Sequence, residues 1–254
     1  KDTTCVAQFK IKSPKAEMSQ FGEAFFLAWT TTPWTLPSNT ALAVGPEITY
    51  VAVQSYNPYT GNKITTLMAQ SLVFSMFNEK AKDIALEDYK VGDKLIPYKI
   101  VGEWKGKDLA GMEYEQLIPW VNPGEGAFKV LAGDFVTTED GTGIVHIAPT
   151  FGADDANVAR AAGIPSLFMI NKKGETRPMV DLTGKFYLLN ELDENFVKEC
   201  VDVDKYKEYQ GAWVKNAYDP QFMVDGKYDE KAAQAAESLD IVIAMMMKAD
   251  NKAF

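Results

Sequence analysis

Runs of apolar residues along the chain are mostly short, which favours β-strands over long helices. Residues 21–29 are strongly apolar and aromatic, and residues 40–44 and 50–54 show similar runs, so each predicts a buried strand. Residues 57–62 are dense in turn formers and are followed by the segment 63–68, so a hairpin is predicted there. Further strands are expected at 95–104, 128–137, 143–148 and 241–247.

Helical spacing of apolar residues is confined to a few segments. Helices are expected at 69–82, 153–163, 192–201 and 228–239. Because strands outnumber helices, we predict a mixed α/β (α+β) fold with a β-barrel-like core decorated by helices. Residues 1–254 are expected to form a single domain, with its core at about 21–190 and a C-terminal extension at 191–254.

Composition narrows the class of protein without identifying it. Of the 254 residues, 46% are apolar and 24% charged, as in an ordinary globular protein, and no apolar run is long enough to span a membrane. Cys5 and Cys200 could pair, but two distant thiols fit a reducing cytoplasm better. The net charge of −9 argues against a large nucleic-acid surface, so any RNA contact should be small.

A peptide rich in threonine follows the first predicted strand. Five threonines, two prolines and a tryptophan occur within residues 30–40. The prolines predict a rigid loop, and threonine hydroxyls, which both donate and accept hydrogen bonds, are suited to hold a water or a ribose hydroxyl. The alternative is a turn in which these hydroxyls only bond to the local backbone.

Two further segments carry candidate polar residues. His146, the only histidine of the chain, lies in the apolar sequence Gly-Thr-Gly-Ile-Val-His-Ile-Ala-Pro, residues 141–149. It is either a structural residue or an imidazole that acts near neutral pH. Asp154 and Asp155 lie at the start of the helix expected at 153–163. One of them either caps that helix or faces a pocket and receives an ammonium group.

Together these segments resemble a known family. The Trp-Thr-Thr-Thr-Pro-Trp-Thr-Leu-Pro-x-Asn peptide, the Gly-Thr-Gly-x-Val-His-x-Ala-Pro segment and Gly-x-Asp-Asp are similar to the editing insertion of isoleucyl-tRNA synthetases, as is the sequence at 109–115. The resemblance extends from about residue 21 to residue 184. Related valyl and leucyl enzymes carry Thr-Arg-Pro in the first peptide, and valyl enzymes have lysine at the position of His146. Both differences favour the isoleucyl family.

The resemblance implies roles for individual residues. Thr30, Thr31 and Thr32 match threonines that contact the terminal adenosine of tRNA and position the hydrolytic water, and Asn39 matches a residue important for editing. His146 matches a histidine lining the amino-acid pocket, and Asp155 matches the aspartate that holds the α-ammonium group. The expected catalytic residues are therefore Thr31, Thr32, Asn39 and Asp155, and the expected substrate-binding residues are Trp29, Thr30, His146 and Asp155. Phe151 departs from the family, because many bacterial relatives have a second histidine there.

The sequence also lacks several motifs. The adenylation motif of class I synthetases needs two histidines, and neither a Lys-Met-Ser-Lys-Ser sequence nor a Walker-type loop is present. One histidine and two distant cysteines predict no metal site, and no Gly-x-Ser-x-Gly elbow is found. The resemblance therefore implies a cofactor-independent hydrolase module of a larger synthetase. Its expected partners are the 3′ CCA end of mischarged tRNA(Ile), valyl-adenylate and the rest of the parent enzyme.

Two other interpretations remain open at this point. The chain could be an editing domain for a different aliphatic amino acid, or a non-catalytic module that binds a tRNA end or another partner. If it is the expected editing domain, a sequence without a metal-ligand pattern and without a Gly-x-Ser-x-Gly elbow leaves direct attack by a positioned water as its mechanism. Threonine hydroxyls and the terminal ribose of the tRNA would then orient that water.

Overall fold

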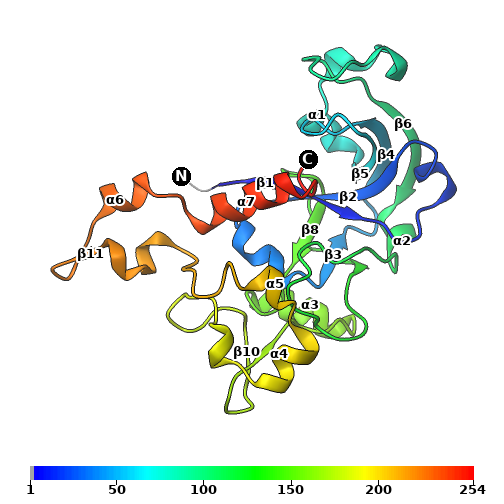
Figure 1. Ribbon diagram of the computed structural model, residues 1–254. Coiled ribbons are helices and arrows are strands. Elements are labelled where there is room, and N and C mark those ends of the chain that lie inside the picture. The colour runs from blue at the N-terminus through cyan, green and yellow to red at the C-terminus, as the bar shows by residue number, and fades with distance from the viewer. Residues whose placement is uncertain (1–2) are drawn as a thin grey trace.

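The computed structural model describes residues 3–254, so the first two residues of the expected domain lie outside it. Two sheets of mixed strand direction form its framework (Figure 1). The larger has the order β1-β2-β5-β4-β6 and the smaller the order β7-β3-β8. The bounds of these strands are Cys5–Lys10 (β1), Glu23–Thr30 (β2), Ala41–Val44 (β3), Thr49–Tyr56 (β4), Lys63–Ala69 (β5), Lys99–Lys105 (β6), Lys129–Ala132 (β7) and Ile144–Ile147 (β8).

Strand pairing combines local hairpins with long-range contacts. β4 pairs antiparallel with β5 around the turn at 57–62, which confirms the predicted hairpin. β2 pairs parallel with β5, and β3 pairs parallel with β7 and antiparallel with β8. The prediction of a mixed fold rich in short strands is confirmed, although the two sheets form no closed barrel within residues 3–254.

Helices and small hairpins cover the sheets and fill the C-terminal part of the chain (Figure 1). The predicted helices at 153–163 and 192–201 are confirmed, and the one at 228–239 is shorter than expected. The helices are Val73–Met76 (α1), Gly106–Leu109 (α2), Ala153–Ala161 (α3), Glu194–Cys200 (α4), Val203–Tyr206 (α5), Glu230–Ala235 (α6) and Leu239–Ala249 (α7). The remaining short strands are Met169–Ile170 (β9), Thr176–Arg177 (β10), Met223–Val224 (β11) and Lys227–Tyr228 (β12).

The strand predicted at 241–247 is wrong, because this segment lies within helix α7. The Ser238 hydroxyl caps the helix by accepting a hydrogen bond from the Ile241 amide at 3.4 Å. Leu239, Ile243 and Met247 follow at intervals of four residues and are all buried. This helical spacing, together with alanine and methionine, which favour helices, outweighs the β-propensity of the short Ile-Val-Ile run.

The helix predicted at 69–82 is also wrong over most of its length. Ala69 still belongs to β5, and α1 ends at Met76 after a single turn. Phe77 then adopts an extended backbone and packs against Tyr98 and Phe254, with ring centroids 5.2 Å and 5.5 Å away. Burial of this aromatic side chain in a small separate cluster therefore ends the helix despite its favourable spacing.

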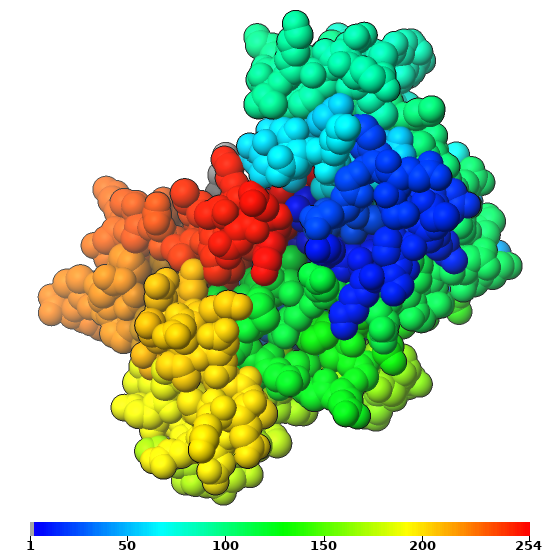
Figure 2. All heavy atoms as spheres, turned by 45° about the vertical axis from the view of Figure 1, so that its right-hand side comes forward, coloured from blue at the N-terminus to red at the C-terminus, as the bar shows by residue number. Residues whose placement is uncertain are grey.

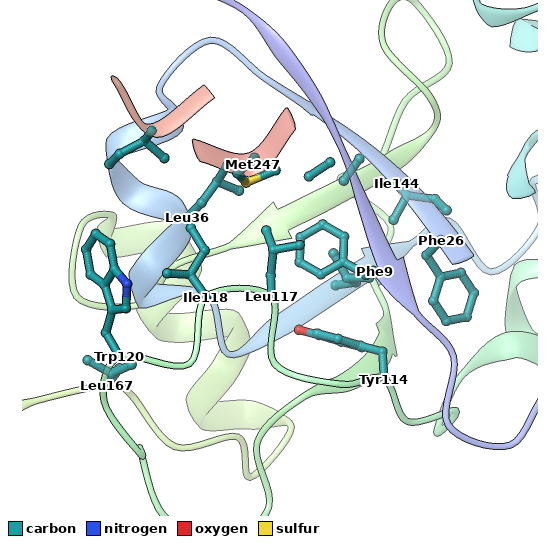
Figure 3. Packing of buried hydrophobic residues seen from close by; sticks show 14 of the residues in the cluster. Phe9, Phe26, Leu36, Tyr114, Leu117, Ile118, Trp120, Ile144, Leu167 and Met247 are labelled. Carbon is teal, nitrogen blue, oxygen red and sulfur yellow. The ribbon is translucent and has the colours of Figure 1, made fainter. Parts of the chain in front are cut away.

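The C-terminal segment packs directly on the N-terminal strand (Figures 1 and 2). The Gln8 amide donates to the Lys252 carbonyl, and the Phe254 amide donates to the Val6 carbonyl, each at 3.0 Å. Met247 joins Phe9, Phe26 and Tyr114 in the main hydrophobic core (Figure 3). Burial of each large apolar side chain contributes roughly 1.5–3 kcal/mol, so α7 is part of the core that supports the cavity described below.

None of the described helices is long and apolar enough to cross a membrane.

Candidate functional site

A cavity of about 370 Å³ lies between the end of β2, the strand β8 and the start of α3. The threonine-rich peptide, the Gly-Thr-Gly segment and the Asp154–Asp155 segment all contribute to its wall, although they are far apart in sequence. The lining residues are Trp29, Thr30, Thr32, Thr35, Phe135, Thr137, Asp140, Gly141, Thr142, Gly143, Ile144, Val145, His146, Ala148, Phe151 and Asp155. The structure thus brings together the three segments that the sequence singled out.

The Gly-Thr-Gly segment at 141–143 fastens one wall of the cavity to the larger sheet. The Thr142 hydroxyl donates to the Leu27 carbonyl at 2.6 Å. The Tyr50 hydroxyl donates to the Gly143 carbonyl at 2.5 Å. Gly143 has a φ of +75°, and a Cβ atom there would lie 2.5 Å from the Cβ of Ala69. Glycine is therefore required at this point both for the backbone conformation and for the close approach to β5.

The threonine-rich peptide leaves β2 at Thr30 and forms a 3-10 helix, Pro33–Ser38. The Thr30 hydroxyl oxygen accepts from the Thr32 amide at 3.1 Å, and the Thr35 hydroxyl donates to the Thr32 carbonyl at 2.9 Å. These two threonines therefore make the local bonds expected of a turn. The Thr32 hydroxyl oxygen instead lies 3.5 Å from the hydroxyl oxygens of both Thr30 and Thr35, and all three residues line the cavity.

Contacts from distant parts of the chain hold this loop in place. The Trp34 amide donates to the carboxylate of Asp240 in α7 at 2.9 Å. The Trp34 ring packs edge-on against Phe151, with ring centroids 4.9 Å apart. Phe151 therefore supports the loop by aromatic packing.

His146 lies in the cavity wall with both ring nitrogens bonded to protein groups. Its Nδ1 is 2.8 Å from Nδ2 of Asn39, and its Nε2 is 3.0 Å from the hydroxyl oxygen of Thr35. Burial lowers the pKa of His146 from its usual 6.5 to about 4, so the imidazole is neutral at pH 7. With neither nitrogen free, the ring is suited to shape the cavity and poorly placed to accept a proton from a water molecule.

Asp155 also lines the cavity, and it does not act as the N-terminal cap of α3. The cap residue is Gly152, and no side chain caps the helix. The Asp155 carboxylate instead accepts a hydrogen bond from the Ala148 amide at 2.9 Å, just beyond β8. Partial burial, opposed by this hydrogen bond and reinforced by Asp154, raises the pKa of Asp155 above its usual value. Such a carboxylate would be stabilised by a cationic ligand.

The electrostatic character of the cavity is acidic. Asp140 and Asp155 both line it, and its wall as described contains no lysine or arginine. A pocket with two carboxylates and several hydroxyls favours a ligand that carries an ammonium group and hydrogen-bonding groups. Among residues 3–254, no group of three or more histidine, cysteine, aspartate or glutamate side chains is arranged to hold a metal ion.

The sequence-derived candidates occupy different positions relative to the cavity. Trp29, Thr30, Thr32, His146 and Asp155 line it. Thr31 is exposed and is not part of the lining, and Asn39 is buried behind His146.

Three residues at or near the cavity, Thr35, Asp140 and Tyr114, are not among the candidates predicted from the sequence. Thr35 falls within the threonine-rich peptide, and Tyr114 within the family segment at 109–115, so both had a local signal. Asp140, next to the Gly-Thr-Gly segment, had none.

The depressed pKa of His146 predicts a loss of stability in acid. The unfolded chain takes up this proton near pH 6.5 and the folded chain only near pH 4. Between these values the unfolded state binds more protons, so stability is full above pH 6.5 and falls as the pH approaches 4, by at most about 3 kcal/mol. Urea titrations at pH 7 and 4.5 measure this loss. His146→Gln should show a smaller loss than the parent chain, and equal losses would contradict the assignment.

Comparisons of the sequence with known proteins identify its relatives. No family model matches the chain. Over its full length it is 75% identical to part of the isoleucine–tRNA ligase of Bacteroides thetaiotaomicron, 68% identical to part of that of Bacteroides fragilis, and 56% identical to part of that of Porphyromonas gingivalis. The chain spans 23%, 21% and 22%, respectively, of the lengths of these relatives.

Solved structures with the same fold are editing domains of leucyl-tRNA synthetases. The cytosolic enzyme of P. knowlesi gives a TM-score of 0.53 at 12% identity, covering 100% of this chain and 96% of that one. That of P. falciparum gives 0.52 at 11% identity, covering 99% and 98%. These identities establish the fold alone.

The chain thus has the mixed α/β fold of the CP1 editing domains, which are modules of aminoacyl-tRNA synthetases. Within this class the chain belongs to the isoleucyl-tRNA synthetase family, as its full-length similarity to a segment of those enzymes shows.

Proposed function

We propose that this chain hydrolyses the ester bond of valine wrongly attached to tRNA(Ile), and that valyl-adenylate is a second candidate substrate. The observation that carries the proposal is the convergence of Asp155, His146 and Thr32 on one acidic cavity. In this account the Asp155 carboxylate receives the α-ammonium group of the amino acid. His146 forms part of the wall around the aliphatic side chain, and Thr32 faces the ester.

A hydrolytic site in addition to the synthetic site is needed because valine and isoleucine differ by only one methylene group. One methylene group changes binding in an aliphatic pocket by only about 1–3 kcal/mol, a magnitude established with isoleucyl-tRNA synthetase itself rather than from this structure. A synthetic site that accepts isoleucine therefore admits valine too often. A hydrolytic cavity that admits valine and excludes isoleucine corrects the error, because the valyl ester enters the cavity and is hydrolysed while the isoleucyl ester is kept out.

The proposed chemistry is direct attack of water on the ester carbonyl carbon, which releases valine and the terminal ribose hydroxyl of the tRNA. The Thr32 hydroxyl is the best-placed threonine to hold that water, since the Thr35 proton is donated to a backbone carbonyl and Thr30 accepts from a backbone amide. The two ring nitrogens of His146 are engaged by Asn39 and Thr35, which leaves the ring in the role of a wall.

Multiple turnover separates this proposal from a binding module. The chain is mixed with an excess of valyl-tRNA(Ile), and free valine is measured over time. We expect valine release to exceed the amount of chain many times over. A non-catalytic module that binds the tRNA end would slow spontaneous hydrolysis by protecting the ester, and this result would overturn the proposal.

Weak binding of tRNA is a further expected result. The net charge of −9 leaves little positive surface for phosphates. We therefore predict end-restricted binding by the chain alone, with a shallow dependence on salt that reflects few released counterions. Filter binding of tRNA(Ile) between about 50 and 200 mM salt tests this. Tight binding with a steep salt slope would contradict it.

We also propose the domain extent, the binding partners and the cellular location of this chain. We infer that residues 1–254 form one editing domain, in which the 191–254 segment packs on the rest through α7 and leads back to the catalytic part of a larger synthetase. The 3′ CCA end of mischarged tRNA(Ile) is its proposed macromolecular substrate, and the cytoplasm its proposed location. The remaining synthetase domains would supply most of the tRNA affinity that the acidic surface of this chain does not favour.

A further inference from the structure

A buried row of hydrogen bonds runs from the hydrophobic core to the cavity wall. The Tyr114 hydroxyl donates to Oδ1 of Asn39 at 2.6 Å, and Nδ2 of Asn39 lies 2.8 Å from Nδ1 of His146. Figure 3 shows Tyr114 in the core beside Phe9, and its side chain is fully buried. Tyr114 and Asn39 do not line the cavity, so they would act on it only through His146.

The direction of these bonds is set by the Ala41 carbonyl, which can only accept, and by the protonated hydroxyl of Tyr114. Nδ2 of Asn39 lies 2.9 Å from the Ala41 carbonyl oxygen, which can only accept. Burial raises the pKa of Tyr114 well above its usual value, so its hydroxyl keeps the proton that it donates to Oδ1. The amide of Asn39 therefore has one orientation, and its nitrogen donates to Nδ1 of His146.

The hydrogen bonds on the Nε2 side of the His146 ring run in the same direction. Because Nδ1 accepts, the proton of the neutral ring is on Nε2, which donates to the Thr35 hydroxyl oxygen at 3.0 Å. Thr35 in turn donates its own proton to the Thr32 carbonyl at 2.9 Å. Every donor in the series thus points from the core towards the threonine loop.

We propose that Tyr114 and Asn39 are positioning residues that hold His146 as the neutral Nε2–H tautomer. To take a proton on Nδ1, the ring would need Asn39 to turn over. That movement would bring Oδ1 against the Ala41 carbonyl and remove the acceptor of the Tyr114 hydroxyl. The two residues together therefore oppose protonation of the ring by a geometric constraint as well as by desolvation.

The consequence for the site rests on the proposed function. The titratable groups that share the cavity with His146 are the carboxyl groups of Asp140 and Asp155. A protonated His146 would compete for these carboxylates and repel the α-ammonium group of the substrate. A ring held neutral leaves Asp155 available for the substrate, and it also gives the wall a constant shape.

The test uses the fact that the chain has a single histidine. Nitrogen-15 NMR of the ring distinguishes a protonated from an unprotonated nitrogen, and a titration gives the pH at which the second proton binds. We expect Nε2 to be protonated and Nδ1 unprotonated in the parent chain. In Tyr114→Phe, the midpoint for proton uptake should rise by about half to one pH unit, equivalent to the loss of one neutral hydrogen bond.

Tyr206→Phe is a matched control, because Tyr206 is also fully buried and donates to a backbone carbonyl, that of Tyr187. It should leave the titration of His146 unchanged. A folded Tyr114→Phe chain with the parent's midpoint would overturn the role of Tyr114, and a parent ring protonated on Nδ1 would overturn the whole proposal. Thr35→Val adds a check that does not depend on the folding of Tyr114→Phe. Nδ1 should stay unprotonated in that variant, and a proton shifted to Nδ1 would contradict control by Asn39.

Activity provides a separate readout. Because the ring takes up its proton near pH 4 in the parent chain and about half to one unit higher in Tyr114→Phe, valyl-tRNA(Ile) hydrolysis by the variant should fall at a higher pH than that of the parent between pH 6 and 4.5. Equal pH profiles in this range would contradict the stated consequence for the site. If the parent chain has no hydrolytic activity while the NMR results are as expected, the proposed function fails and the tautomer assignment stands.

Discussion

Asp155→Asn is expected to slow hydrolysis of valyl-tRNA(Ile) by about 10- to 100-fold. A charge-assisted contact to an ammonium group contributes on the order of 1.5–3 kcal/mol, and each ~1.4 kcal/mol is a factor of ten. The substitution removes the negative charge but keeps an oxygen that can accept from the Ala148 amide, the bond that Asp155 makes in the structure. Single-turnover rates under subsaturating conditions measure the effect.

Asp154→Asn is the matched control. Asp154 is the exposed neighbour in the same turn of α3, and it does not line the cavity. Its replacement changes the charge by the same amount and should leave the rate close to that of the parent. If both variants lose activity equally, the effect is one of general charge and the proposed ammonium contact is wrong. A folded Asp155→Asn chain with full activity would also contradict it.

His146→Ala is expected to raise the ratio of isoleucine to valine hydrolysis about tenfold or more. If His146 closes the wall against the larger side chain, its removal makes room for one more methylene, worth about 1–3 kcal/mol. The mutant should begin to hydrolyse correctly charged isoleucyl-tRNA(Ile), while its activity on the valyl ester changes less. Rates on the two substrates, measured side by side, give the ratio.

The alternatives for His146 give different results in the same assay. A catalytic histidine would slow both reactions alike, and a structural one would lower stability without changing the ratio. His146→Gln, which retains much of the volume, should keep the ratio closer to that of the parent chain. If the ratio does not rise in His146→Ala, the size limit lies elsewhere, and Thr30 or Trp29 becomes the better candidate because both line the cavity.

The sequence predicted the residues that line the cavity better than it predicted the buried contacts that hold those residues in place. Trp29, Thr30, Thr32, His146 and Asp155 lie in distinctive local motifs, and all of them line one cavity. By contrast, the partner that orients Asn39 is Tyr114, which lies 75 positions further along the chain. Spacing within a motif carries no information on such a contact, because the strand pairings and the core packing bring the two residues together.

The prediction of secondary structure from sequence was wrong where tertiary contacts outweigh the local preference of the residues. The run 241–247 is rich in β-branched residues at its start, yet its buried positions follow a helical period once Ser238 caps the helix. The helix predicted at 69–82 stops because Phe77 is buried in a separate aromatic cluster. Thr31 illustrates the same limit within a motif. It stands between Thr30 and Thr32, both of which line the cavity, but its side chain is exposed and lies outside the lining.

The most direct test of the account is a comparison of hydrolysis of valyl-tRNA(Ile) and isoleucyl-tRNA(Ile) by this chain under the same conditions. Because the affinity for tRNA is expected to be weak, both rates are measured over a range of chain concentrations and corrected for spontaneous hydrolysis. The account predicts clear catalysis on the valyl ester and little or none on the isoleucyl ester. Equal rates on both esters, or no acceleration of either at any concentration, would contradict it.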